Sequence, residues 1–174
     1  LKLRAACAWV DDWLAGSDGK MILFGVHKAV LGHLAKRYKG RSVLLDGSVT
    51  GKKRQQAVSE FLLKPQTRLL LGQIRAAGTG WSAKGVSDVA FLELDWEPGV
   101  HTQAEDRCHG IGRGEAGVAS TVWYLVARGT IEEQLAELLQ DKMGVINATL
   151  DGDGNGDDLS IFNQLCDLLM KEGR

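Results

Sequence analysis

The sequence lacks several features that mark common functional classes. No uninterrupted apolar run approaches the roughly 20 residues that a membrane span needs. The 3 cysteines, Cys7, Cys108 and Cys166, are scattered without the paired spacing of a zinc site. We therefore expect free thiols in a reducing compartment and a soluble protein. Its expected location is the cytoplasm or nucleoid of a bacterium or phage, or the nucleus of a eukaryote.

Two glycine-rich stretches resemble ligand-binding loops but lack their decisive residues. In the run 47–53 the glycines stand four apart and no Ser or Thr follows the lysine pair, so it is not a nucleotide-binding Walker A loop. The run 151–158 opens like a calcium-binding EF-hand loop, but Phe162 stands where a bidentate Glu is needed. We therefore expect no bound metal in this chain, and the lack of a G-x-G-x-x-G motif argues against another kind of nucleotide-binding enzyme.

Charge is distributed unevenly along the chain, although the net charge is only −1. Between residues 28 and 54 there are eight basic residues and a single acid, Asp46. The basic residues are Lys28, Lys36, Arg37, Lys39, Arg41, Lys52, Lys53 and Arg54. From residue 129 to the end, ten acids outnumber three basic residues. The first block can follow a phosphate backbone, although its lysines could equally form a solvated helix face.

Short apolar runs alternate with helical patterns. The runs 21–24, 43–45, 68–71, 89–92 and 121–126 suit strands that are buried on both faces of a sheet. Two helical stripes lie between them, formed by Val30, Leu31, Leu34 and Tyr38, and by Ala57, Val58, Phe61 and Leu62. A capping box predicts a further helix from Thr130 with the buried stripe Ile131, Leu135, Leu138, Leu139 and Met143. The alternation predicts an α/β fold of three layers, with a mainly parallel central sheet and helices on both faces.

The domain organisation follows from the same patterns. We expect one main domain over residues 1–150, followed by an acidic Gly/Asp loop and a terminal helix over residues 151–174. The chain begins at Leu1, without a methionine, inside a helical pattern. We therefore expect it to be a fragment of a longer polypeptide.

The segment from Leu69 to Thr130 carries the most specific motifs. Residues 69–80, 94–99 and 103–113 resemble motifs V and VI of the Swi/Snf-type ATPases of helicase superfamily 2. Residues 20–28 resemble motif IV, residues 46–61 the next family signature, and residues 124–133 the segment that closes the lobe. The resemblance covers roughly residues 15–148 and leans, around Trp96, towards the DNA-annealing branch. It implies a second, C-terminal RecA-like lobe with a C-terminal helical appendage.

The resemblance also implies how such a lobe serves ATP hydrolysis. ATP with Mg²⁺ would lie between two lobes in the full-length protein, with the magnesium held mainly by the missing first lobe. Arg107 is the candidate arginine finger, with Gln103 one helical turn earlier on the same face. Arg107 could instead pair with Glu105 or Asp106, but neighbours in a helix do not face one another. Nucleotide binding or coupling between lobes is expected of Gly78, Thr79, Gly80 and Asp106.

The sequence departs from the family at one important position. The family usually has a second arginine three residues after the first and a Gln at the end of the motif, where this chain has Gly110 and Arg113. Gly110 cannot supply charge, and three explanations stay open. Arg113 reaches the phosphates from one turn further on, or ATP turnover is weaker than the family norm, or the motor is degenerate.

Contact with DNA is expected at phosphates, because a motor that moves along any sequence must not depend on base edges. The candidate residues are His27, Lys28, Thr50, Lys52, Arg54 and Arg75. Thr50 stands at a predicted helix N-cap, where backbone amides can bind a phosphate. Ser48 and Thr50 could equally serve only as capping residues.

The expected function is that of the second motor lobe of a DNA-stimulated ATPase that translocates on duplex or forked DNA and remodels or anneals it. The expected partners are this DNA and the N-terminal RecA-like lobe of the same chain, without which the lobe should be inactive; no membrane partner is expected. The alternative is a non-catalytic DNA-binding or interaction module with a degenerate ATPase lobe.

Overall fold

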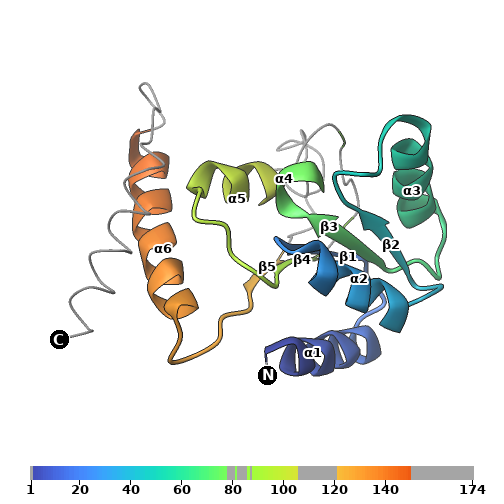
Figure 1. The fold of residues 1–174 in the computed structure, drawn as a ribbon, viewed down its shortest axis with the longest axis horizontal. Coiled ribbons are helices and arrows are strands. Elements are labelled where there is room, and N and C mark those ends of the chain that lie inside the picture. Colours follow the sequence, from blue (N-terminus) through green and yellow to red (C-terminus); the bar gives the residue numbers. More distant parts are fainter. Residues whose placement is uncertain (1, 78–80, 82–85, 87, 106–120, 150–174) are drawn as a thin grey trace.

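The computed structural model describes residues 2–77, 81, 86, 88–105 and 121–149 (Figure 1). Its centre is a parallel sheet of five strands in the order β2-β3-β1-β4-β5. The strands are β1 (Met21–Gly25), β2 (Ser42–Leu45), β3 (Leu69–Gln73), β4 (Asp88–Phe91) and β5 (Thr121–Tyr124). Each falls on one of the predicted apolar runs, so the predicted α/β fold with a parallel central sheet is confirmed.

Helices cover both faces of the sheet (Figure 1). Side chains of α1 (Lys2–Gly16) and α2 (Lys28–Arg37) pack into one core, and those of α3 (Gly51–Leu63), α4 (Ile74–Ala77) and α5 (Pro98–Glu105) pack into the other. The last described element, α6 (Ile131–Thr149), packs beside α5. The predicted three layers are therefore present.

The central strand β1 explains why the strand sequences are almost entirely apolar. Met21 and Leu23 point into the core under α1 and α2, whereas Ile22 and Phe24 point into the opposite core. All four are fully buried, because successive side chains of a strand alternate between faces and both faces are covered. Burial of such a side chain contributes about 1.5–3 kcal/mol relative to its exposure to water.

Two basic side chains close the C-terminal ends of helices at the amino edge of the sheet. Arg68 donates hydrogen bonds to the carbonyl oxygens of Leu14, Ser17 and Gly19, where α1 ends. Lys20 donates to the carbonyls of Phe61, Lys64 and Thr67, where α3 ends. Helix C-termini leave carbonyls without partners and attract cations. Burial, followed by the nearby Arg68, lowers the pKa of Lys20.

Helix α6 begins where the capping box predicts, with the Glu132 amide donating to the Thr130 hydroxyl at 3.3 Å. Leu135 and Leu139 are buried and Leu138 packs against them. The predicted burial of Ile131 is wrong, because the residue is 45% exposed and lies outside the small cluster that Leu135 and Leu139 form. The side chain of Met143 lies outside the described part of the chain.

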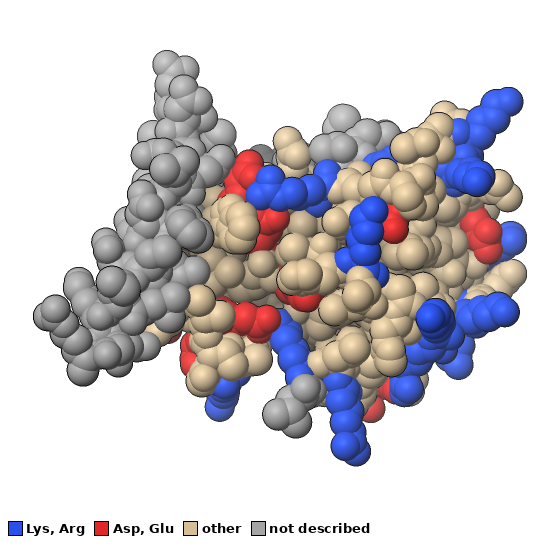
Figure 2. Space-filling view, in the orientation of Figure 1, with Lys and Arg blue, Asp and Glu red and all other residues tan. Residues whose placement is uncertain are grey.

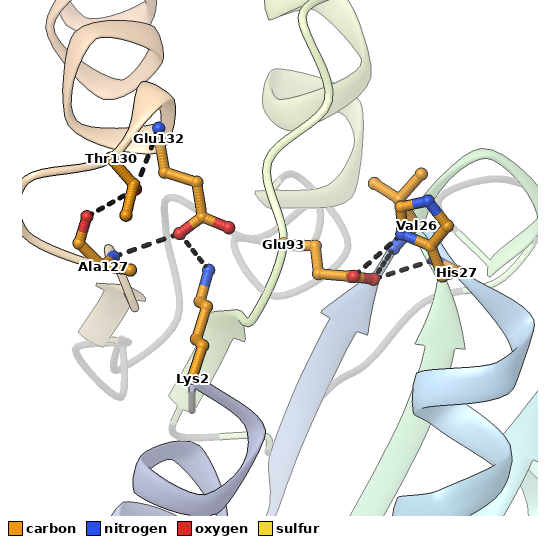
Figure 3. A network of polar contacts seen from close by, with 7 residues as sticks. All are labelled: Lys2, Val26, His27, Glu93, Ala127, Thr130 and Glu132. Atoms are coloured by element: carbon orange, nitrogen blue, oxygen red, sulfur yellow. Dashed lines mark hydrogen bonds and ion pairs between the residues drawn. The ribbon is translucent and has the colours of Figure 1, made fainter.

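Helices α1 and α6 are tied together by an ion pair. Lys2 Nζ lies 2.5 Å from Glu132 Oε2, and the same carboxylate oxygen accepts a bond from the Ala127 amide at 3.1 Å (Figure 3). The contact fixes the start of α6 against the start of α1.

Several sequence expectations concern parts of the chain that the structure describes only in part. No helix among the described residues is long and apolar enough to cross a membrane. Cys7 is a free, buried thiol, and the other two cysteines lie outside the described residues. The segment 151–174, expected as an acidic loop and terminal helix, also lies outside them.

Candidate functional site

The connections of the sheet single out the carboxyl end of β1. The chain leaves β1 for α2 on one face, but it leaves the two neighbouring strands, β3 and β4, for helices on the other face. In open α/β sheets, ligands bind where successive connections diverge in this way, outside the carboxyl ends of the strands. The residues that follow β1, β3 and β4 therefore form the candidate site.

The carboxylate of Glu93 lies beside the end of β1 (Figure 3). Glu93 Oε2 accepts hydrogen bonds from the amides of Val26 and His27, both at 2.8 Å. Glu93 Oε1 lies 2.8 Å from Nδ1 of the His27 ring. A Cβ atom on Gly25 would come within 3.2 Å of Glu93 Oε2, so the glycine makes room for this approach.

Gln73, at the end of β3, holds the same segment from the other side. Its Nε2 donates to the Val26 carbonyl at 3.2 Å, and its Oε1 accepts from the Gly47 amide at 3.2 Å. One amide side chain therefore joins the ends of β1, β2 and β3. The backbone that leads into α2 is fixed by Gln73 and Glu93 together.

Arg75, the second residue of α4, lies in a network of carboxylates. Its Nε and one terminal nitrogen bond the two oxygens of Asp95, both at 2.8 Å, and its other terminal nitrogen lies 2.8 Å from Glu97. The Arg75 side chain is 52% exposed, whereas that of Asp95 is 5% exposed. The hydrogen bonds with Asp95 raise the pKa of Arg75 above its usual range. Two acids thus compensate the charge of this predicted DNA contact.

His101 contacts the backbone of Asp95. The ring is fully buried, and its Nε2 lies 2.9 Å from the Asp95 carbonyl oxygen and 3.1 Å from the Asp95 amide. The ring also packs on Phe91, with centroids 4.7 Å apart. Burial lowers the pKa of His101 below its usual range, which favours the neutral ring. His101 on α5 and Arg75 on α4 therefore meet at Asp95.

The basic candidates lie along the same edge. Lys28 opens α2 directly after His27, whose side chain is 73% exposed, and Lys52 and Arg54 lie in the first turn of α3. Figure 2 shows lysine and arginine side chains predominating over the part of the molecule that α2 and α3 form. The structure thus places the starts of α2 and α3 at one edge of the sheet, on opposite faces of it.

The sequence left open that Ser48 and Thr50 serve only to cap the N-terminus of α3. Thr50 stands at the predicted N-cap position, but its hydroxyl makes no capping hydrogen bond. The amide and hydroxyl of Ser48 both bond the carboxylate of Asp46, and these bonds lower the pKa of Asp46. Capping of α3 by these two hydroxyls is therefore not seen.

The predicted ATP-facing residues are described only in part. Gln103 is exposed on α5, whose opposite face buries Pro98, His101 and Ala104 against the sheet. The others lie outside the described residues: Gly78, Thr79, Gly80, Asp106, Arg107, Gly110 and Arg113. Within the described part, no group of three or more His, Cys, Asp or Glu is placed to hold a metal ion.

The sequence motifs did not predict a role for the acids at this edge or for the residues that hydrogen-bond near them. These residues are Gln73, Glu93, Asp95, Glu97 and His101. A usable signal was present, because Glu93 and Asp95 come directly after a buried apolar run. Polar residues at that position reach the edge of a parallel sheet where ligands bind.

Comparison with known proteins agrees with the motifs. Residues 2–112 match the family described as the helicase conserved C-terminal domain. The chain is 35% identical over 154 residues to the human "DNA annealing helicase and endonuclease ZRANB3", covering 87% of this chain and 14% of that protein. It is 32% identical over 148 residues to the "SWI/SNF-related matrix-associated actin-dependent regulator of chromatin subfamily A-like protein 1" of Xenopus tropicalis, covering 83% of this chain and 15% of that protein. The chain thus spans only a small part of the length of these relatives.

Two solved structures have a similar fold. One is the C-terminal part of the Fun30 ATPase domain, with a TM-score of 0.69 and 21% identity, covering 79% of this chain and 44% of that one. The other is the Sulfolobus solfataricus SWI2/SNF2 ATPase core in complex with dsDNA, with a TM-score of 0.64 and 21% identity, covering 92% of this chain and 33% of that one. From its motifs, its family match and its fold, the chain belongs to the helicase conserved C-terminal domain family, as a RecA-like second lobe of the Swi/Snf type related to the DNA annealing helicases.

Proposed function

We propose that this lobe is the second half of a DNA-stimulated ATPase that moves along duplex DNA and remodels or anneals it. One observation carries the proposal: His27, Lys28, Lys52 and Arg54 follow different strands, yet all lie at the carboxyl edge of the sheet. The helix that leads towards Arg107, α5, starts at the same edge. DNA and nucleotide contacts would therefore share one rigid border of the domain.

The DNA side of the proposal rests on charge and exposure. Lys28 and Lys52 are exposed, and among the described residues no carboxylate forms an ion pair with either. Phosphate contacts by such side chains give affinity without sequence preference, which suits movement along any duplex. The name of one structural relative, an ATPase core in complex with dsDNA, supports this interpretation. Because Asp95 and Glu97 compensate Arg75, we propose a smaller DNA contribution for it than for Lys52.

For ATP hydrolysis, we propose that α5 and the residues after it stabilise the charge of the transferring phosphate. When bound between two lobes, ATP with Mg²⁺ supplies the transferring phosphate, and the first lobe would hold most of the magnesium coordination. Arg107 would place positive charge where negative charge builds up, with Gln103 helping to position it. Gly78, Thr79, Gly80 and Asp106 would couple nucleotide state to DNA contact. Without a first lobe, the chain would not hydrolyse ATP.

The test compares ATP turnover by the two-lobed polypeptide with turnover by the 174-residue chain, each with and without duplex DNA. We expect DNA-stimulated turnover only from the two-lobed protein. Arg107→Ala should lower its rate by a factor of about 10³ or more, as loss of an arginine finger does elsewhere. ATP affinity should change less, because the charge matters most in the transition state. A rate within about twofold of wild type, about 0.4 kcal/mol of barrier, would contradict the assignment.

A second candidate function is favoured by Gly110, which stands where the family usually has an arginine. In this alternative the lobe binds DNA or a partner but no longer supports hydrolysis. Gly110→Arg and Arg113→Ala separate the cases. Loss of turnover in Arg113→Ala, restored by adding Gly110→Arg, would show that Arg113 has taken over the role. A wild-type protein that is inactive but gains turnover with Gly110→Arg would show a degenerate motor.

A further inference from the structure

An acidic side chain stands in the middle of the edge that we propose faces DNA. Glu93 accepts three hydrogen bonds, from the amides of Val26 and His27 and from the His27 ring, all at 2.8 Å (Figure 3). Its side chain is only 18% exposed, whereas that of His27 is 73% exposed. The carboxylate is thus enclosed beneath a histidine that faces solvent.

A carboxylate at such a position is unfavourable for DNA binding on charge alone, because it repels phosphates. By that argument its removal should tighten binding. Glu93 also occupies two backbone amides at the approach to α2, so a phosphate cannot use them. Contact with DNA at this point is then left to the first amides of α2 and to side chains, and His27 and Lys28 are the two side chains that the segment offers.

The contact with Glu93 fixes the orientation of the His27 ring. An ionised carboxylate only accepts hydrogen bonds, so Nδ1 carries a proton and donates it to Glu93 Oε1. The second ring nitrogen, Nε2, is then on the side of the ring away from this bond. A ring held in this way has lost its rotational freedom before DNA arrives, which reduces the entropy cost of forming a contact.

We propose that Glu93 is a positioning residue for DNA binding, which holds His27 so that Nε2 donates a hydrogen bond to a backbone phosphate. The inference rests on the proposed function of this edge. In the complex the ring would be the imidazolium form, with one proton towards Glu93 and the other towards the phosphate. Both hydrogen bonds would then be charge-assisted, which is the stronger kind.

The first test measures duplex binding by the 174-residue chain at several salt concentrations. Glu93→Ala is expected to weaken binding about fivefold or more at low salt and to reduce the slope of log affinity against log salt by about 0.9, the value for one phosphate contact. The matched control is Glu97→Ala, which removes an acid from the same edge and releases Arg75. This control should tighten binding. If Glu93→Ala also binds as tightly as wild type, or more tightly, Glu93 acts only through its charge and the proposal is overturned.

A double-mutant cycle separates positioning of one ring from general support of the loop. In a His27→Ala background, Glu93→Ala should cause no further reduction of affinity or salt slope. In a Lys28→Ala background it should still cause the full reduction, because the described bonds of Glu93 go to Val26 and His27 and not to Lys28. Equal coupling of Glu93 to both residues would show that the carboxylate merely holds the backbone, and would refute the proposal.

A substitution of His27 provides a test whose result would not change if Glu93 had only a structural role. His27→Lys supplies a flexible cation that needs no ring orientation, so in this background Glu93→Ala should tighten binding rather than weaken it. Continued weakening would count against positioning.

The folded state of each variant is checked by thermal unfolding. If Glu93→Ala does not fold, Glu93→Gln takes its place. Its oxygen can still accept from the backbone amides, while its amide nitrogen can only donate to an unprotonated Nδ1, which leaves the ring uncharged, so the same reduction of the salt slope is expected. Wild-type chain that binds no duplex at low salt would overturn the proposed function and this inference together. Duplex binding that is indifferent to Glu93 would overturn the inference alone.

Discussion

Replacing Arg75 with alanine is expected to destabilise the fold by about 2 kcal/mol. The substitution removes both hydrogen bonds to Asp95 and the ion pair with Glu97, each at 2.8 Å. Asp95 is the partner that matters, because its side chain is only 5% exposed and water cannot replace the guanidinium without a local rearrangement.

The magnitude follows from the unequal exposure of the partners. An exposed ion pair contributes about 0.2–1 kcal/mol, and the Arg75 side chain, 52% exposed, belongs partly to that class. A buried acceptor left without its donor costs about 1–3 kcal/mol, more for a charged group. Breaking a fully buried pair costs about 3–5 kcal/mol, which is an upper limit here. A value near 2 kcal/mol lies between these limits.

The measurement is urea unfolding of the 174-residue chain, followed by circular dichroism. With a slope of about 1–3 kcal/mol per molar urea, the midpoint should fall by about 1 M with the slope unchanged. Glu97→Gln is the control, since it removes only the more exposed partner and should cost about 0.5 kcal/mol or less. An Arg75→Ala effect no larger than that of Glu97→Gln would refute the view that Asp95 depends on Arg75.

Three further predictions concern packing, protonation and the basic block. Gly72→Ala should destabilise the fold by about 1–3 kcal/mol in the same assay, because its Cβ would lie 2.8 Å from the Cβ of Ala77, whereas Gly99→Ala, with open space around it, should not. Burial lowers the pKa of His101, so the unfolded chain binds a proton at this residue more readily than the folded chain does. The contribution of His101 to the free energy of unfolding should therefore be present above pH of about 6.5 and decline as the pH falls below it. That slope should be absent from the unfolding free energies of His101→Phe. Alanine at positions 52–54 should weaken DNA binding and reduce the salt slope by about 0.9 for each phosphate that these side chains neutralise; an unchanged slope would show that the block is only a solvated surface.

The sheet could be predicted from sequence because its three middle strands, β3, β1 and β4, are buried on both faces. The prediction of the same burial for β5 is wrong, because β5 lies at the edge of the sheet and its side chains are mostly exposed. Residues such as Leu23 and Leu70 must be apolar whichever face they point to, so each strand is a continuous run that stands out from the helices. The burial of Ile131, in contrast, could not be predicted from its spacing. Its spacing places it on the apolar stripe of α6, but burial depends on which neighbours cover that stripe, and the first turn extends past them.

The candidate site could be predicted only where residues stand in motifs. His27, Lys28 and Arg54 stand in motif-like segments and Lys52 in the basic block, and their role in DNA binding stays a prediction; the structure places their elements at one edge. Glu93 and His101 were not predicted, because their contacts are set by folding: Glu93 bonds the end of β1 and His101 bonds the backbone of Asp95. Such pairings depend on strand order and packing, which spacing along the chain does not reveal.

The strand order also determines when the sheet can form during synthesis. The strand made first, β1, is the central one, and its neighbours come much later: Met21 pairs with Leu69 of β3 and with Asp88 of β4. At about 5–20 residues per second, β1 waits roughly 2 to 10 seconds for β3 to be translated. During that time residues 21–24, fully buried in the finished sheet, have no strand to pair with. A nascent chain that stalls before Leu69 therefore carries an unpaired apolar strand, and should aggregate or recruit chaperones rather than wait in a folded state.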